Sequence, residues 1–242
     1  MYNKLMSYMP WHWVNYNINI SLKHKYVYFE NPKVACSSIK KTLINYELGE
    51  LSNRWGNVIH QSLFHSAFVK PYQLKEETFW EIINDPKYLK FSFVRSPYSR
   101  ALSCYLQKIK TKASGYEQIK PFLTDSEIES NISFQRFLEI VDEMDCYDMN
   151  SHFRPQTQQL FFKQINLGFI GKLENFNQDF ANVLSKISGE DEPPITHIFS
   201  AHQTNACSKL DGYLTPEIID LINRIYSDDF THYGYQKMIS SK

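Results

Sequence analysis

The chain has 242 residues, of which 43% are hydrophobic and 15% aromatic, and its 26 basic residues balance its 26 acidic ones. This composition predicts one globular domain over residues 1–242 and excludes the basic excess that general nucleic-acid or membrane-surface binding requires. No apolar run reaches the roughly 18 residues of a membrane span, and residues 1–19 lack the features of a signal peptide. Four scattered cysteines without a CxxC pair are typical of a reducing compartment, so we expect a cytoplasmic protein.

The first half of the chain predicts alternating strands and helices. We expect an irregular, aromatic-rich lead-in over residues 1–22 and a folded core over about 25–235. Aromatic and β-branched residues predict a strand at 26–29, and the apolar spacing after Ser38 predicts a helix. The segments that follow are a loop at 49–57, a short strand at 58–60, a helix around 79–83, a buried strand at 90–95 and a helix that begins at Pro97.

The second half continues the pattern. Residues 110–121 are polar and predict a surface loop, and residues 125–148 predict a helix with an acidic outer face. A strand at 167–171 precedes an apolar helical stripe at 176–187, and Thr215 followed by Pro216 marks the start of the last long helix. Strands that alternate with helices predict an α/β fold with a central, mostly parallel sheet flanked by helices on both sides.

The segment at 26–44 has the layout of a phosphate-binding site, because a strand leads through a short loop into a helix. The first N–H groups of a helix have no partner inside it, and the helix dipole adds positive character there. Lys33 contributes a full charge, and Ser37 and Ser38 contribute hydroxyl donors. The segment lacks the glycines of a nucleoside-triphosphate P-loop, and its lysine precedes the turn. An ordinary surface turn remains an alternative on this segment alone.

A second anion-binding candidate follows the strand at 90–95. Arg95 lies at the strand end and Ser103 on the second turn of the next helix. Because ligands of open α/β sheets bind beyond the carboxyl ends of the strands, Arg95 and Lys33 could hold two phosphates of one nucleotide. The alternative is a surface arginine with an ordinary helical serine.

These segments carry a family resemblance. Residues 32–38 (PKVACSS) and 93–105 (FVRSPYSRALSCY) resemble the paired signatures PKxAxxS and FVRxPxxRxxSxY of the membrane-type carbohydrate sulfotransferases. Three more segments resemble later family segments in the same order: 152–156 (HFRPQ), 169–174 (FIGKLE) and 229–235 (DFTHYGY). Cys36 and Ser37 stand where the family usually has Gly, Thr or Ser. The resemblance implies the P-loop-like sulfotransferase fold.

The resemblance implies transfer of a sulfuryl group from 3′-phosphoadenosine 5′-phosphosulfate (PAPS) to a hydroxyl group, on a carbohydrate or another acceptor, with adenosine 3′,5′-bisphosphate as product and without a metal. Its first signature would hold the 5′-phosphosulfate and its second, through Arg95 and Ser103, the 3′-phosphate. A polar loop at 202–209 would close over the nucleotide through Asn205, Ser208 and Lys209. The residues of the first signature are Pro32, Lys33, Val34, Ala35, Cys36, Ser37 and Ser38.

Lys33 and a histidine are the expected catalytic residues. The resemblance implies that the base for the acceptor proton lies between the two signatures, where His65 is the first choice and His60 the second. Their spacing does not predict a metal site. Because the Golgi members' membrane anchor has no counterpart here, we expect either a soluble bacterial-type member or a Golgi-lumen enzyme whose anchor has been removed.

Two rival functions remain open at this stage. A nucleotide kinase would depend on Mg²⁺ and would place an acidic metal ligand at a strand end, where this chain has Arg95. A non-catalytic nucleotide-binding relative would have lost the base, whereas His60 and His65 are both present.

Overall fold

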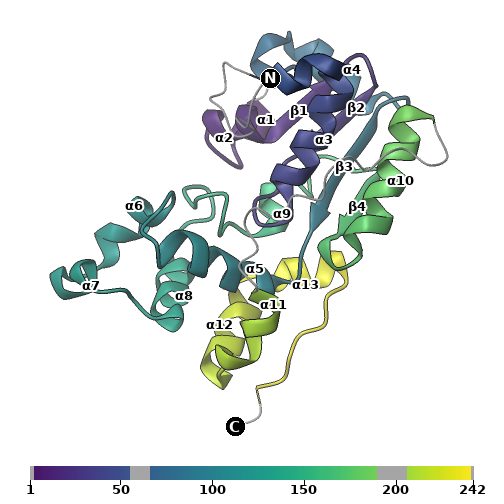
Figure 1. The fold of residues 1–242 in the computed structure, drawn as a ribbon. Coiled ribbons are helices and arrows are strands. Elements are labelled where there is room, and N and C mark those ends of the chain that lie inside the picture. The colour runs from purple at the N-terminus through teal and green to yellow at the C-terminus, as the bar shows by residue number, and fades with distance from the viewer. Residues whose placement is uncertain (1–2, 55–65, 190–205, 241–242) are drawn as a thin grey trace. The chain divides into compact units, whose positions relative to one another are not determined.

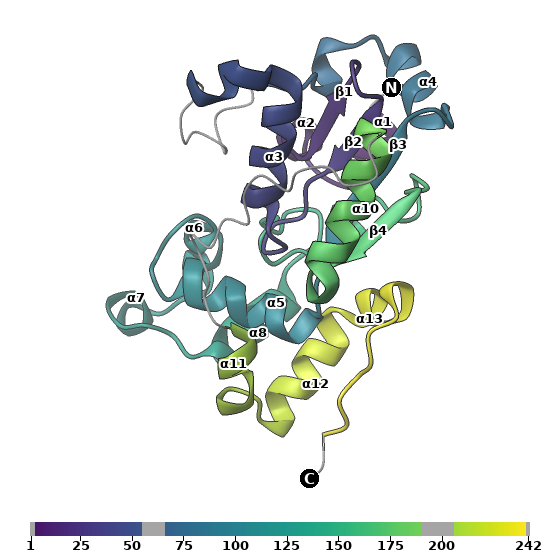
Figure 2. The same cartoon turned by 45° about the vertical axis from the view of Figure 1, so that its right-hand side comes forward.

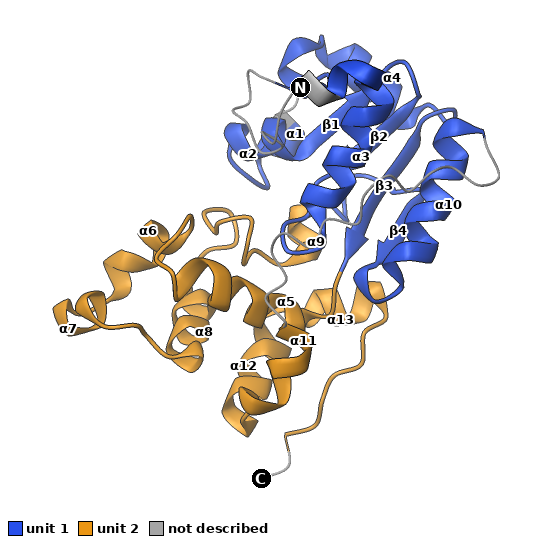
Figure 3. Ribbon diagram, viewed as in Figure 1, with its two compact units in different colours: residues 1–94, 160–201 blue, residues 95–159, 202–242 orange. Residues whose placement is uncertain are grey.

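The computed structural model describes residues 3–54, 66–189 and 206–240 (Figure 1). The chain divides into two compact units (Figure 3). Unit 1 comprises residues 1–94 and 160–201, and unit 2 comprises residues 95–159 and 202–242. Whether the two units act as the single domain expected from the sequence stays a prediction. In the described ranges, no helix is both long and apolar enough to cross a membrane.

Unit 1 is built on a four-stranded sheet with the strand order β1-β2-β3-β4. The strands are β1 (Ile18–Ser21), β2 (Tyr26–Phe29), β3 (Leu89–Val94) and β4 (Phe169–Lys172). The β2–β3 and β3–β4 pairings are parallel, as expected, but β1 runs antiparallel to β2, so the sheet is mixed. The fold is therefore α/β with a mixed sheet.

The irregular lead-in expected over residues 1–22 is wrong. Helix α2 (Trp11–Asn17) leads directly into β1, whose Ile18 lies opposite Phe29 of β2. Strand β1 has only four residues and carries Asn19 and Ser21 at alternate positions. Ile18 and Ile20 alternate with these polar residues, so the segment has the period of a strand as well as the pairing with β2.

One face of the sheet carries a row of aromatic side chains. Tyr28 packs on Phe91 with ring centroids 5.2 Å apart, and Phe93 packs on Phe180 at 5.9 Å. Helices α3 (Cys36–Leu48) and α10 (Phe176–Ser188) cover this face with their apolar residues, and both run alongside the sheet in Figures 1 and 2. Because successive strand residues point to opposite faces, the buried Val27 points to the other face, which is covered as well.

Gly171 of β4 makes room for this aromatic row. A Cβ atom at this position would overlap the ring of Phe93, which is its neighbour in the β3–β4 pairing. The glycine in the segment 169–174 is therefore explained by the close approach of an aromatic ring.

Shorter elements complete unit 1. The helix expected around residues 79–83 is α4, and the loop expected at 49–57 is in part a 3-10 helix, η1. The strand expected at 58–60 lies outside the described residues. These shorter elements are α1 (Asn3–Met6), η1 (Gly49–Arg54), η2 (Pro71–Gln73), α4 (Glu76–Asn84) and η5 (Leu173–Asn175).

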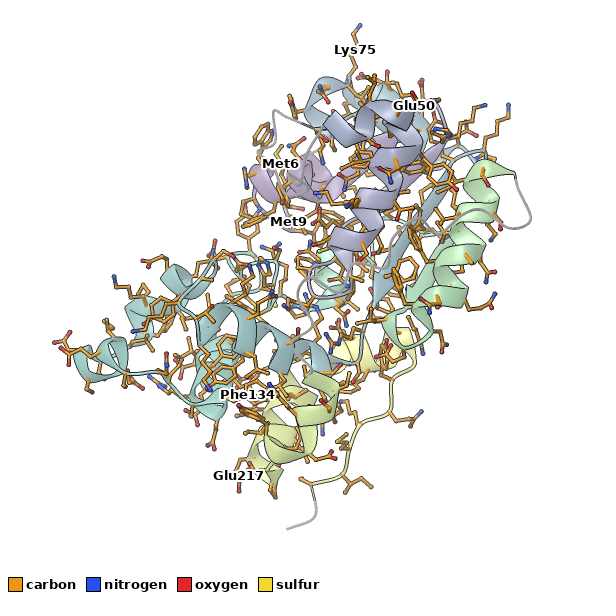
Figure 4. The ribbon with its side chains drawn as sticks, viewed as in Figure 1. Met6, Met9, Glu50, Lys75, Phe134 and Glu217 are labelled. Atoms are coloured by element: carbon orange, nitrogen blue, oxygen red, sulfur yellow. The ribbon has the colours of Figure 1, made fainter. Side chains whose placement is uncertain are left out.

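The described part of unit 2 is helical. Its core joins aromatic and aliphatic side chains of α5, α8 and α12. Figure 4 shows Phe134 of α8 among these side chains, whereas Glu217 of α12 points outward. The elements are α5 (Pro97–Cys104), the π-helix η3 (Tyr105–Ile109), α6 (Tyr116–Ile119), η4 (Lys120–Phe122), α7 (Asp125–Glu129), α8 (Phe134–Glu143), α9 (Gln156–Gln159), α11 (Ala206–Lys209), η6 (Leu210–Gly212), α12 (Pro216–Ile225) and α13 (Ser227–Tyr233).

Helix capping explains where several of these helices begin. The hydroxyl of Thr215 accepts a hydrogen bond from Ile218 N–H and Pro216 follows it, which confirms the expected start of α12. The single helix expected within residues 125–148 is instead two, α7 and α8. Ser133 interrupts the helical run, because its hydroxyl caps α8 by accepting the N–H of Arg136 at 3.0 Å. The polar segment at 110–121 contains α6, whose Tyr116 and Ile119 are buried.

Candidate active site

The loop between β2 and α3 has an unusual backbone. Lys33 has φ of 74° and Ala35 has φ of 62°, both in the left-handed region that favours glycine. The sequence supplies no glycine here, so each residue carries a backbone strain of about 1–3 kcal/mol. Strain of this kind persists only where the surroundings hold the loop firmly.

The same backbone conformation leaves N–H groups at the start of α3 in an arrangement that suits an anion. Ala35 is the N-cap residue, and it makes no side-chain capping hydrogen bond. A left-handed residue followed by the helical Cys36 points successive N–H groups to one side, which is the arrangement of an anion-binding nest. The dipole of a helix of 13 residues adds positive character. Lys33 and Ser37 are half-buried at this end, so the residues present fit a phosphate or sulfate group.

A buried ion pair lies behind this loop. The Lys40 ammonium group is 3.0 Å from the Glu30 carboxylate, and the two side chains are 6% and 2% exposed. Lys40 also lies over the ring of Tyr16, 5.0 Å from its centroid. On the other side, the Asn31 amide donates to the carbonyl of Phe93 at 2.9 Å. The loop is therefore fixed both to α3 and to the end of β3.

A second buried lysine belongs to the same region. The Lys70 ammonium group donates to Asn19 Oδ1 at 2.6 Å and to the carbonyls of Tyr16 and Ile18 at 3.1 and 3.4 Å. Burial, and after it the charge of Lys40, lowers the pKa of Lys70 from 10.5 to about 7, against the opposing effect of Glu30.

We expect this lysine to make stability depend on pH. Between pH 7 and 10.5 the unfolded chain holds a proton on Lys70 that the folded chain does not. The free energy of unfolding should therefore rise with pH, by about 1.4 kcal/mol per unit at most. Denaturant unfolding at pH 7.5–9 measures the slope of the free energy of unfolding against pH. Lys70→Met should remove this slope. Lys87→Met, which replaces an exposed lysine, should keep it. An unchanged slope in Lys70→Met would contradict the assignment.

In unit 2, the side chain of Arg95 is held close to the start of α5. Its Nε donates to Ser99 Oγ at 2.8 Å, and its Nη2 lies 3.4 Å from Cys207 Sγ. Ser103 lies one helical turn beyond Ser99 on the same face of α5 and is 3% exposed. Arg95 and Ser103, both expected from the sequence, are thus linked through Ser99, which contacts Arg95 and shares a helix face with Ser103. The sequence reasoning missed Ser99. Its spacing of four residues from Ser103 places both serines on one face of a helix, and this spacing could have indicated it.

One further polar residue of the second signature, Arg100, has a structural role. Arg100 is 2% exposed, and it donates to the carbonyls of Arg154 and Ser151 at 2.8 and 3.0 Å. Arg154 in turn donates to the carbonyls of Cys146 and Tyr147, both at 3.0 Å. These contacts shape the segment 146–154, which leads to α9.

Two residues that the sequence did not single out are linked to Arg95 by a chain of hydrogen bonds. Gln156 hydrogen-bonds to the backbone of Arg95, and Asp229 hydrogen-bonds to Gln156. Both occur in segments that the family resemblance includes, but the sequence does not show that the segments meet. Burial raises the pKa of the Asp229 carboxyl, while hydrogen bonds from the N–H groups of Gln156 and Thr157 and the charge of Arg100 act in the opposite direction.

The remaining predicted site residues divide into two groups. His60, His65 and Asn205 lie outside the described residues, so their roles stay predictions. Ser208 and Lys209 are exposed on α11, which corrects the expectation of a loop for this part of 202–209. A four-residue helix carries too little periodicity to be predicted. Within the described ranges, no group of three potential metal-ligating His, Cys, Asp or Glu side chains gathers.

Comparison with known proteins gives consistent matches. The model of the sulfotransferase family matches residues 16–236. Carbohydrate sulfotransferase 14 of Danio rerio is 30% identical over 71% of this chain and 48% of its own length. Carbohydrate sulfotransferase 9 of Homo sapiens is 25% identical over 78% of this chain and 44% of its own length.

Carbohydrate sulfotransferase 12 of Mus musculus is 21% identical over 92% of this chain and 61% of its own length. The chain therefore spans about half the length of the first curated relatives it matches, at 48% and 44%. No solved structure gives a significant match.

Proposed function

Because the chain belongs to the sulfotransferase family, we propose that it transfers a sulfuryl group from PAPS to a hydroxyl group of a carbohydrate. The observation that carries the proposal is the loop at residues 32–38, where Lys33 and the start of α3 form a cradle for an anion. The same membership supports a P-loop-like sulfotransferase fold for the sheet of unit 1.

The residues of the loop would hold the 5′ end of the donor. The backbone N–H groups at the start of α3, together with Ser37 and Ser38, would donate to its oxygens. PAPS supplies an activated sulfuryl group and a phosphate leaving group. Lys33 would neutralise the charge that develops on that phosphate as the bond to sulfur breaks, which is electrostatic stabilisation of a transition state. This charge allows the proposed in-line transfer to proceed without a metal.

Other residues would hold the nucleotide and activate the acceptor. Arg95 and Ser103 would bind the 3′-phosphate, since a planar guanidinium group matches phosphate geometry. Asn205, Ser208 and Lys209 would contact the nucleotide from the segment that includes α11. His65, or else His60, would take the acceptor proton, a role that contributes about 10²–10⁴-fold to the rate.

A ligand-stabilisation experiment tests the donor class. Adenosine 3′,5′-bisphosphate at 100 times its Kd should stabilise the protein by about 2.7 kcal/mol, which raises Tm by roughly 5–10 °C in a chain of this length. ATP with Mg²⁺ should leave Tm unchanged. Stabilisation by ATP with Mg²⁺ alone would contradict the proposal and favour a kinase. Incubation with PAPS and carbohydrate acceptors then separates an enzyme, which forms the bisphosphate product, from a relative that only binds the nucleotide.

A further inference from the structure

The side-chain amide of Gln156 holds both polar backbone atoms of Arg95. The N–H of Arg95 donates to Gln156 Oε1 at 2.9 Å, and Gln156 Nε2 donates to the carbonyl of Arg95 at 2.8 Å. Gln156 is completely buried, and Arg95 is 8% exposed. A strand partner would make the same pair of hydrogen bonds, so the amide takes the place of a neighbouring strand at the residue that follows β3.

Asp229 fixes the orientation of this amide. Its Oδ2 accepts hydrogen bonds from Gln156 N–H at 2.8 Å and from Gln156 Nε2 at 3.3 Å. Its Oδ1 accepts from the N–H and the hydroxyl of Thr157 at 2.8 and 3.0 Å. If the amide were rotated by half a turn, its oxygen would face two acceptors, the Asp229 carboxylate and the Arg95 carbonyl. The carboxylate therefore selects the orientation that holds Arg95.

These contacts join segments that are far apart in the sequence. Arg95 and Gln156 are 61 residues apart, and Gln156 and Asp229 are 73 residues apart. The buried contacts converge on the backbone of an arginine whose Nε is itself held by Ser99 at 2.8 Å. The direction of a guanidinium group depends on its backbone, and a misplacement of about 1 Å weakens a bidentate interaction strongly.

We propose that Gln156 and Asp229 are positioning residues that hold the Arg95 guanidinium group in place for the 3′-phosphate of the nucleotide. The inference rests on the proposed function, because that function supplies the 3′-phosphate. Neither residue touches the ligand: Gln156 acts through the backbone of Arg95, and Asp229 acts through Gln156. If the two residues had a purely structural role, their replacement would lower the stability of unit 2. It would not weaken the binding of one nucleotide more than that of the other.

The test compares two ligands that differ only in the 3′-phosphate. Calorimetry on the full chain gives the Kd of adenosine 3′,5′-bisphosphate and of adenosine 5′-monophosphate for each variant. Gln156→Met keeps the side-chain length and removes the amide, and Asp229→Asn keeps the shape in case the first variant does not fold. In each folded variant the bisphosphate affinity should fall at least tenfold, and the monophosphate affinity should change less than twofold. Gln158→Met, a half-buried glutamine on the same helix, should change neither affinity.

The possible outcomes separate the inference from the function on which it rests. Arg95→Ala should reduce the preference for the bisphosphate in the same way as Gln156→Met. If Arg95→Ala removes the preference and both Gln156→Met and Asp229→Asn retain it, the positioning role is wrong and the proposed function stands. If the unmodified chain binds neither nucleotide, or shows no preference for the bisphosphate, the proposed function itself fails.

Discussion

Replacement of Lys33 by alanine is expected, under the proposed function, to lower the rate of sulfuryl transfer by roughly 10²–10³-fold, the loss typical when one preorganised charge-stabilising group is removed. Lys33 is half-buried at the loop that precedes α3. Alanine keeps the Cβ atom, so the left-handed backbone at this position carries the same strain as before. The fold should therefore persist while the charge is lost, and turnover of PAPS measured together with Tm distinguishes the two effects.

Two matched variants make this result specific. Lys33→Arg restores the positive charge and should recover part of the lost rate, although the guanidinium group places its donors differently. Lys23→Ala removes an exposed lysine of the same unit and should leave the rate unchanged. A Lys33→Ala enzyme with the original kcat would show that charge neutralisation lies with another residue.

The second large effect should come from the ion pair of Glu30 and Lys40. Lys40→Met removes the ammonium group that lies 3.0 Å from the Glu30 carboxylate, which is 2% exposed, and this should cost about 3–5 kcal/mol in the free energy of unfolding. Glu30→Met should cost a similar amount for the corresponding reason. The double variant should cost much less than the sum, because it leaves neither charge uncompensated. Urea unfolding of the four proteins gives the coupling energy directly.

An exposed ion pair provides the control. Arg224 and Asp142 are 2.7 Å apart, but the Arg224 side chain is 60% exposed. Arg224→Met should therefore cost only about 0–1 kcal/mol. Additive losses in the Glu30 and Lys40 variants would mean that the buried pair contributes no mutual stabilisation.

Much of the fold could be predicted because its signals are local. The run at Tyr26–Phe29 and the residues Pro97 and Thr215 mark a strand and two helix starts that the structure confirms. Strand β1 was missed although Ile18 and Ile20 alternate with polar residues, because four residues give only a weak periodic signal. The same limit applies to α9 and α11, which are single turns.

The sequence singled out Lys33 and Arg95 as candidates, but it did not show which residues hold them in place. Lys33 and Arg95 stand out from motif order, whereas Lys40 and Lys41 look alike in the sequence although only Lys40 is buried. The meeting of Gln156 with Arg95 and Asp229 depends on chain segments more than sixty residues apart, at separations of 61 and 73. The left-handed backbone at Ala35 was hidden as well, because glycine, its usual sequence signal, is missing.

The glycine-free loop also has a consequence for how this chain can change. Glycine at position 33 or 35 would relieve backbone strain of about 1–3 kcal/mol, so selection for stability alone would favour it. Glycine at position 33 would delete the charge, and glycine at either position would let the loop sample many conformations. Under the proposed function, stability and activity therefore oppose each other at these two positions. They are then poor targets for thermostabilisation and informative ones for measuring a trade-off between stability and activity.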